Sequence, residues 1–158
     1  MDARFPRNEL IRRVEAIADK RCAIKIRNWD AERFLKDYVQ KLPQNTLIYC
    51  DPPYYNKAER LYMNHYTAAD HARIASVIQN KVVHPWIVSY DNAMPVAVCY
   101  ENRRTFLYTL QYNAARPHRG EELFFISDGL NLPTRSSIPA IDLALRKEGI
   151  VGQLHLSI

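Results

Sequence analysis

Apolar residues recur at every third or fourth position in several parts of the chain, and this spacing predicts amphipathic helices. In the segment that starts at Asn8, for example, Leu10, Val14 and Ile17 would share one helical face. A helix start is also expected at Thr67, because Asp70 three residues later completes a variant of the capping box. The helices expected on these grounds are residues 8–20, about 31–41, 67 to at least 78, 94–100 and about 138–147.

Shorter runs rich in apolar, β-branched and aromatic residues predict strands, namely residues 22–26, 46–50, 85–90, 104–112 and 121–127. Strands and helices alternate as far as Tyr100, and two strands then follow each other directly. Alternation of this kind is typical of α/β proteins. We therefore expect an α/β fold with a mostly parallel sheet, a C-terminal antiparallel hairpin and helices on both faces.

The composition narrows the class of protein. With 158 residues, 47% hydrophobic and 25% charged, the chain has the size and polarity of one globular domain. Its formal net charge of +5 suits a polyanionic partner. The three cysteines and five histidines show no spacing typical of a metal site, so no metal is expected. No apolar run is long enough to span a membrane and no signal core is present, so we expect a cytoplasmic protein.

Three acidic residues each follow the end of a predicted strand: Asp30, Asp51 and Asp91. In open parallel sheets ligands bind beyond the carboxyl ends of the strands, so these carboxylates indicate an active-site edge. The alternative is structural, since Asp is common after strands because it caps the helix that follows.

Asp51-Pro52-Pro53-Tyr54 is the most informative of these junctions. Two prolines stiffen the turn and donate no N–H, so the backbone carbonyls stay free as acceptors. The Asp51 carboxylate adds an acceptor and Tyr54 adds a flat aromatic face, which together suit a planar amine. The alternative is a plain Pro-Pro turn with Tyr54 as partly buried filler.

The segment Leu47 to Tyr55 resembles the catalytic motif of Dam-type (DPPY-motif) DNA adenine-N6 methyltransferases. The flanking segments that are similar to this family, in the same order, are residues 23–30, Tyr66 with Asp70-His71, 87–92, 108–112 and 121–126. The resemblance covers about residues 8–127. It implies that residues 1–127 are the C-terminal catalytic part of a partial Rossmann-like methyltransferase sheet. Residues 128–158 would form a tail with one helix.

The resemblance implies transfer of a methyl group from S-adenosylmethionine to N6 of an adenine that is flipped out of double-stranded DNA. Asp51, Pro52, Pro53 and Tyr54 would form the catalytic motif. Tyr54 would stack on the base, while the Asp51 carboxylate and the Pro52 carbonyl would accept hydrogen bonds from the amine. No covalent intermediate and no metal would be needed.

Further contacts are implied in the same way. Asp30 and Asp51 would contact the cofactor, and Tyr55 and Tyr112 would join Tyr54 against the substrate. Residues 113–120 are expected to form a basic loop, in which Arg116 and Arg119 would hold the phosphates of the flipped strand. The alternative for this loop is a solvated surface without a role in binding.

The part of the family that holds most of the cofactor has no counterpart in this sequence. All four glycines (Gly120, Gly129, Gly149 and Gly152) follow Asp51, and none forms the family's Phe-x-Gly-x-Gly segment. Two strands of the family's sheet, which would lie between residues 23–26 and 47–50, are also missing. We therefore expect the chain to be incomplete as an enzyme and to need a second chain that supplies the glycine-rich half.

Other functions remain open at this point. The chain could be a noncatalytic remnant or a DNA-binding module that lacks cofactor binding. It could also be an amine methyltransferase acting on RNA, because related motifs serve several planar amines. The flanking matches favour DNA methylation, of the kind found in restriction–modification systems.

Overall fold

The computed structural model describes residues 6–56, 66–112, 118–131 and 141–142. The chain divides into two units, Met1–Asp30 and Ala31–Ile158, and the site residues discussed below lie mostly in the second. No helix in the described part is long and apolar enough to cross a membrane.

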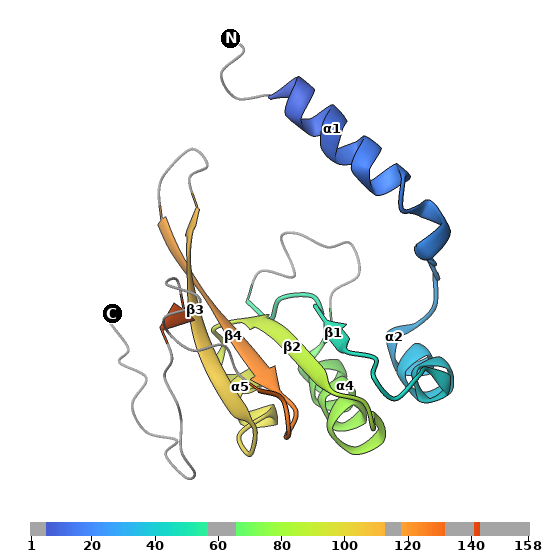
Figure 1. Cartoon of the computed structure of the whole chain (residues 1–158). Coiled ribbons are helices and arrows are strands. Elements are labelled where there is room, and N and C mark those ends of the chain that lie inside the picture. The colour runs from blue at the N-terminus through green and yellow to red at the C-terminus, as the bar shows by residue number, and fades with distance from the viewer. Residues whose placement is uncertain (1–5, 57–65, 113–117, 132–140, 143–158) are drawn as a thin grey trace. The chain divides into compact units, whose positions relative to one another are not determined.

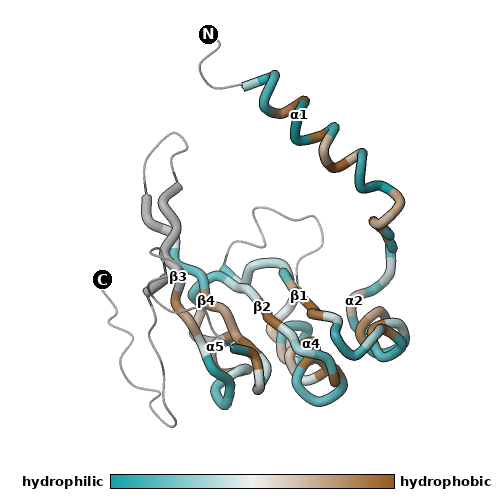
Figure 2. Tube along the Cα trace, in the orientation of Figure 1, coloured by the Kyte–Doolittle hydropathy of each residue, from teal (hydrophilic) through white to brown (hydrophobic). Residues whose placement is uncertain are grey.

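The first unit contains helix α1 (Arg7–Ala18) and the short 3-10 helix η2 (Arg21–Ala23). The helix expected at residues 8–20 is confirmed, and hydrophobic and hydrophilic residues alternate along it (Figure 2). None of its side chains is buried. The strand expected at residues 22–26 is wrong: η2 occupies its start, and Ile26 is 84% exposed. Apolar residues favour a strand only where a neighbouring strand supplies hydrogen bonds and packing, and residues 22–26 pair with no described strand.

The second unit begins with one continuous helical segment made of three kinds of turn: α2 (Ala31–Arg33), the π-helical η3 (Phe34–Tyr38) and the 3-10 helix η4 (Val39–Lys41). The helix expected at residues 31–41 is confirmed in extent. Leu35 and Val39 are buried, while the rings of Phe34 and Tyr38 stack with centroids 5.1 Å apart. The segment thus contributes one apolar side to the core of this unit.

A five-stranded sheet follows, in the order β1-β2-β4-β3-β5 (Figure 1). Its strands are β1 (Ile48–Cys50), β2 (Trp86–Asp91), β3 (Arg104–Tyr112), β4 (His118–Ile126) and β5 (Ile141–Asp142). The α/β class and the antiparallel hairpin, β3 with β4, are confirmed. Among neighbouring strands only β1 and β2 pair parallel. However, β4 lies antiparallel between β2 and β3, so β1, β2 and β3 share one direction, as expected of a mostly parallel sheet with an antiparallel hairpin. Strands that run in one direction need crossover connections, and α4 (between β1 and β2) and α5 (between β2 and β3) provide them.

The tail also departs from expectation at one place. Ile141–Asp142 form β5, which pairs antiparallel with β3, where a helix was expected over about 138–147. The rest of that expected helix lies outside the described residues. Helical spacing in a short segment is a weak signal, and here pairing with an edge strand prevails over it.

Helix α4 (Ala68–Lys81) connects β1 to β2, and α5 (Met94–Cys99) follows β2. The capping box is confirmed: the Asp70 amide donates to Thr67 Oγ1 at 3.2 Å, and the Thr67 amide donates to Asp70 Oδ2 at 2.8 Å. Hydrogen bonds from Thr67, and one from Arg73, lower the pKa of Asp70 to about 2. The helix start that the sequence indicated is therefore fixed locally.

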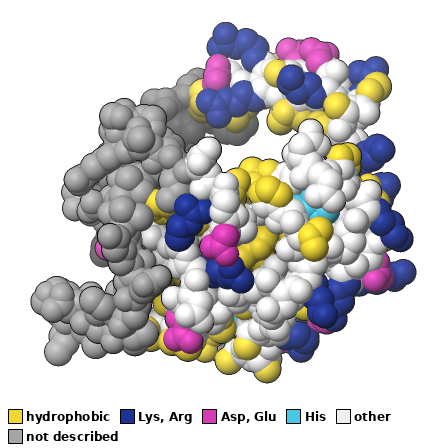
Figure 3. Space-filling model, turned by 60° about the horizontal axis from the view of Figure 1, so that its bottom comes forward, with side chains coloured by type: hydrophobic (Ala, Val, Ile, Leu, Met, Phe, Trp, Pro, Cys, Tyr) yellow, Lys and Arg dark blue, Asp and Glu magenta, His cyan; other side chains and the backbone are white. Residues whose placement is uncertain are grey.

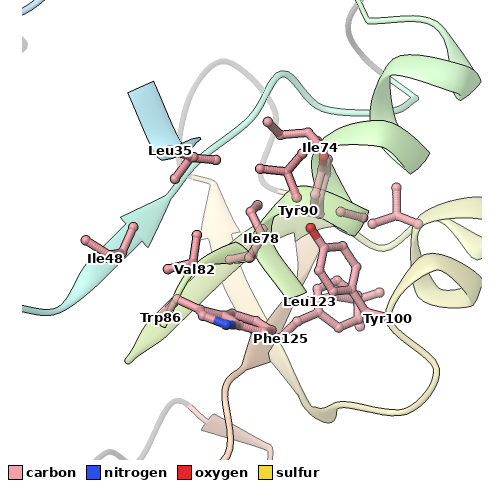
Figure 4. Packing of buried hydrophobic residues seen from close by; sticks show 14 of the residues in the cluster. Leu35, Ile48, Ile74, Ile78, Val82, Trp86, Tyr90, Tyr100, Leu123 and Phe125 are labelled. Atoms are coloured by element: carbon pink, nitrogen blue, oxygen red, sulfur yellow. The ribbon is translucent and has the colours of Figure 1, made fainter. Parts of the chain in front are cut away.

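One hydrophobic cluster forms the core, and side chains from α4, β1, β2 and β4 meet in it (Figure 4). Buried residues of η3, η4, α4 and α5 all belong to this cluster, so the described helices of the second unit cover the same face of the sheet. Helices on both faces, as expected, are therefore not what the described part of this unit shows. Fully burying one large apolar side chain contributes roughly 1.5–3 kcal/mol, so this face holds the sheet together.

Candidate functional site

Two of the three acids that follow predicted strands come together at one edge of the sheet. Asp51 directly follows β1, and Asp91 is the last residue of β2. Because β1 and β2 are parallel neighbours, their carboxyl ends meet at the same edge. Asp30 ends the first unit, so its part in a site stays a prediction.

Asp51 is held by a chain of hydroxyl groups. Tyr49 Oη donates to Ser89 Oγ at 2.9 Å, and Ser89 Oγ donates to Asp51 Oδ1 at 2.8 Å. Ser89 is buried on β2, with 1% of its surface exposed, whereas Asp51 is exposed. The buried hydroxyl therefore fixes one carboxylate oxygen while the carboxyl group as a whole faces solvent, where a ligand can reach it.

Tyr54 is also fixed from a neighbouring strand. Its phenol Oη donates to Glu122 Oε1 on β4 at 2.6 Å, a short charge-assisted hydrogen bond. Tyr54, Pro52 and Pro53 are all half-buried. The ring of Tyr54 is thus tied at its far end, which limits the positions that its aromatic face can take.

The residues after Tyr54 bind to the end of β2. The backbone amides of Tyr55 and Asn56 donate to Asp91 Oδ1 and Oδ2, at 2.7 and 2.8 Å. Asp91 is buried, with 5% of its surface exposed. A buried carboxylate needs such donors, and here both of its oxygens accept one.

An aromatic layer supports this loop from beneath. His71 of α4 is buried, and its ring lies 5.1 Å from Tyr55, 5.3 Å from Tyr66 and 5.5 Å from Tyr90 between centroids. His71 Nδ1 lies 3.0 Å from Tyr90 Oη. Burial lowers the pKa of His71, against the opposite effect of the nearby carboxylates of Asp91 and Asp70. The imidazole is therefore neutral at neutral pH and acts as a packing element.

The remaining predicted substrate contacts lie on the hairpin. Tyr112 pairs with His118, and Arg119 pairs with Gln111, in the register of β3 and β4. Only their backbone is described, and Arg116 lies outside the described residues. The basic loop expected over 113–120 is shorter than predicted, because His118 to Gly120 belong to β4. Backbone pairing along the hairpin explains this extension.

Two further observations concern possible metal ligands and thiols in the described part of the chain. No group of three or more His, Cys, Asp or Glu side chains there is arranged to hold a metal ion. Burial raises the pKa of Cys50, which directly precedes Asp51, to about 11, so it remains a thiol at neutral pH. The groups that the site offers are an exposed carboxylate, backbone carbonyls and an aromatic ring.

The positive charge of the chain is not gathered at one place on the face shown in Figure 3. Lys and Arg side chains occupy several separate areas of the described surface, with Asp or Glu beside some of them. The net charge of +5 therefore favours a polyanion in general without locating its binding surface.

Sequence reasoning did not assign a role to Ser89 or Glu122, the residues that bind Asp51 and Tyr54. A signal for Ser89 was present, because it is a polar residue inside the apolar strand 86–91. A buried hydroxyl in such a strand needs a partner, and the neighbouring strand ends in Asp51. Glu122 had no comparable signal, since its contact depends on the pairing of β2 with β4.

Comparison with known proteins adds the family. The family model of the D12 class N6 adenine-specific DNA methyltransferases matches residues 3–114. The match includes Asp51 to Asn56, Ser89 and Asp91, and it ends before β4. Among curated proteins, none matches the chain. A match over this much of the sequence is decisive: the chain belongs to the D12 class of N6 adenine-specific DNA methyltransferases.

Proposed function

We propose that this chain carries the base-binding half of an enzyme that transfers a methyl group from S-adenosylmethionine to adenine N6 in DNA. The observation that carries the proposal is the pairing of an exposed carboxylate, Asp51, with an aromatic side chain, Tyr54, at one edge of the sheet. Each is fixed by a hydrogen bond to a neighbouring strand, at 2.8 Å to Ser89 and 2.6 Å to Glu122. Residues 1–127 would be the catalytic part.

The chemistry needs an amine nitrogen whose lone pair is released from conjugation with the base. Asp51, with one oxygen held by Ser89, would accept a hydrogen bond from the N6 amine through the other oxygen, and the Pro52 carbonyl would accept a second. When bound, S-adenosylmethionine supplies an electrophilic methyl group on sulfur. The Asp51 carboxylate would stabilise the positive charge that develops on the amine nitrogen as the nitrogen takes up the methyl group, until the proton passes to water.

Tyr54 would stack on a flipped adenine, with Tyr55 and Tyr112 as further contacts to the substrate. Because the ring of Tyr54 and the carboxylate of Asp51 are each fixed by a hydrogen bond, they would confine the base to a narrow range of orientations. Correct orientation of the reacting groups lowers the barrier of the transfer. Arg116 and Arg119 would contact the phosphates of double-stranded DNA, and Asp30 would contact the cofactor together with Asp51.

The free edge of β1 is where the cofactor half would join. Ile48 N donates to Pro85 O at the start of β2, so by the alternation of a parallel ladder the backbone groups of Leu47 and Tyr49 point away from β2. No described strand pairs with that side. Leu47 and Tyr49 are 52% and 56% exposed. We propose that a second chain with the glycine-rich segment pairs there and completes the cofactor site.

The described residues fit only one side of the cofactor. They would supply acceptors and a ring on the side of the methyl group, but none of the four glycines precedes the site to form a cradle for the remainder. We therefore expect the chain alone to show no binding in calorimetric titration with S-adenosylmethionine. Micromolar affinity of the lone chain would contradict the proposed division into two halves.

The decisive experiment uses the chain co-purified with a polypeptide that contains the family's Phe-x-Gly-x-Gly segment. Transfer of tritiated methyl groups to a DNA duplex and, in a parallel reaction, to RNA is measured, and N6-methyladenine is identified after digestion. Asp51→Ala should abolish transfer while cofactor binding is largely retained, because Asp30 and the glycine-rich half would hold most of the cofactor. The control is Asp37→Ala, which removes a carboxylate that is 61% exposed on η3 and should leave activity unchanged.

The outcomes separate the alternatives. Label that appears in RNA and not in DNA would favour an RNA amine methyltransferase. A complex that binds the DNA duplex but no cofactor would favour a noncatalytic DNA-binding module. Full activity in Asp51→Ala would disprove the role given to this carboxylate.

A further inference from the structure

Two carboxylates that face each other across the sheet bind the segment that follows Asp51. In the register of β2 with β4, Asp91 lies opposite Glu122. Asp91 accepts the backbone amides of Tyr55 and Asn56, and Glu122 accepts the hydroxyl group of Tyr54. Three consecutive residues of the loop therefore donate to one cross-strand pair.

The prolines explain why the loop is held at these residues. Pro52 and Pro53 have no backbone N–H, so they offer no donor by which the sheet could hold the turn itself. The amides of Tyr55 and Asn56 point at one anion, an arrangement in which successive N–H groups form a binding site for negative charge. Here the anion is a side chain of the same protein.

The carboxylate pair Asp91 and Glu122 and the loop that donates to it also stabilise each other. Like charges directly opposite on neighbouring strands are destabilising. Donors from the loop offset this repulsion, because hydrogen bonds to charged groups are among the stronger ones in proteins. Asp91 is buried in the folded chain, and a buried carboxylate that lost these two donors would be strongly destabilising.

We propose that Asp91, together with Glu122 opposite it on β4, positions the segment Asp51 to Asn56 for catalysis. The segment would be positioned in this way in the chain alone, before the glycine-rich chain binds. The inference deepens the proposed function, since it concerns the same site. Asp91 touches neither substrate nor cofactor in this account. It acts on Tyr54 and Asp51 by fixing the path of the backbone that follows them.

The test begins with the purified chain alone, by NMR measurement of amide hydrogen exchange. The amides of Tyr55 and Asn56 should be protected, and Asp91→Asn should increase their exchange by roughly tenfold or more, because one charged acceptor is lost. The matched control is Asp70→Asn, another carboxylate that accepts a backbone amide, that of Thr67 at 2.8 Å. It should leave exchange at Tyr55 and Asn56 within about twofold.

A second variant acts from the loop side. Asn56→Pro removes one donor to Asp91 without altering β2, and should weaken protection of the Tyr55 amide while leaving amides of β2 protected. If Asp91→Asn fails to fold, Asn56→Pro still tests whether the hydrogen bonds to Asp91 hold the loop. Exchange of both wild-type amides at the rate of an unstructured peptide would overturn the proposal outright.

In the reconstituted enzyme, Asp91→Asn should lower kcat by a larger factor than it raises KM for S-adenosylmethionine, because the glycine-rich half would hold most of the cofactor. A general loss of structure would move both constants to a similar extent. If the complex has no activity at all, the proposed function fails, but the exchange experiment on the lone chain still decides whether Asp91 holds the loop. An unchanged kcat in a variant whose loop amides exchange freely would contradict the catalytic part of the inference.

Discussion

Two buried tyrosines near the candidate site should respond in opposite directions to the same chemical change. Tyr90 of β2 and Tyr100, which follows α5, are 0% and 1% exposed. Tyr90 Oη lies 3.0 Å from His71 Nδ1, whereas Tyr100 Oη finds no hydrogen-bond partner in the described part of the structure. Replacing each by Phe removes one hydroxyl and leaves the ring in place, including the stacking of Tyr100 on Phe125 at 4.4 Å.

The magnitudes follow from whether a buried polar group keeps its partner. Tyr90→Phe leaves both ring nitrogens of His71 without a partner among the described residues, which should lower the free energy of unfolding by about 1–3 kcal/mol. Tyr100→Phe removes a hydroxyl whose burial is not compensated there, so it should be neutral or stabilise by up to about 1 kcal/mol. A difference of about 2 kcal/mol between the variants corresponds to roughly 4–8 °C in Tm.

The measurement is urea unfolding at pH 7.5 followed by far-UV circular dichroism, with the slope of the transition compared among the three proteins. An unchanged slope shows that stability alone has changed. Equal stability of the two variants, or a Tyr100→Phe protein less stable than Tyr90→Phe, would refute the assignment of the His71–Tyr90 hydrogen bond as the one that stabilises this layer.

Three further predictions concern the site, its support and the sheet edge. Ser89→Ala should reduce methyl transfer by the reconstituted enzyme roughly 10- to 100-fold, because Asp51 loses the donor that orients it, and a rate within twofold of wild type would argue against that role. Since burial lowers the pKa of His71, the unfolded state binds more protons just below pH 6.5, so the free energy of unfolding should fall as pH decreases below that value, by up to about 1.4 kcal/mol per pH unit. Urea midpoints at pH 7.5, 6.5 and 5.5 check this, and the pH-dependent part should disappear in His71→Gln. Leu47→Lys should leave the chain folded but block assembly with the glycine-rich chain in size-exclusion chromatography, whereas Val83→Lys, at a 71% exposed apolar side chain in the connection between α4 and β2, should assemble normally.

Local signals in the sequence were reliable where the physical cause is itself local. The capping box at Thr67 depends on residues three apart, and the structure has it as expected. The strands around Ile48, Val88 and Phe106 were expected from apolar runs, and their buried side chains account for that pattern. Helical spacing over residues 31–41 was also correct, and Leu35 and Val39 of this segment are buried.

Expectations failed where the state of a segment depends on a distant partner. Residues 22–26 have the composition of a strand, yet no described strand lies beside them, so their backbone forms a 3-10 turn and an extended stretch. Ile141–Asp142 lie in a segment with helical spacing, and pairing with β3 makes them a strand. Neither partner can be read from the segment itself.

The candidate site divides in the same way. The sequence by itself determined that an acidic Pro-Pro-Tyr turn follows a buried strand, and that Asp51 and Asp91 would share an edge, because strand ends and residue types are written along the chain. Only the tertiary structure decided that Ser89 orients Asp51, that Glu122 holds Tyr54 and that Asp91 binds the next two amides. Those contacts join residues 35 to 68 positions apart, so they exist only once β1, β2 and β4 are aligned in one register.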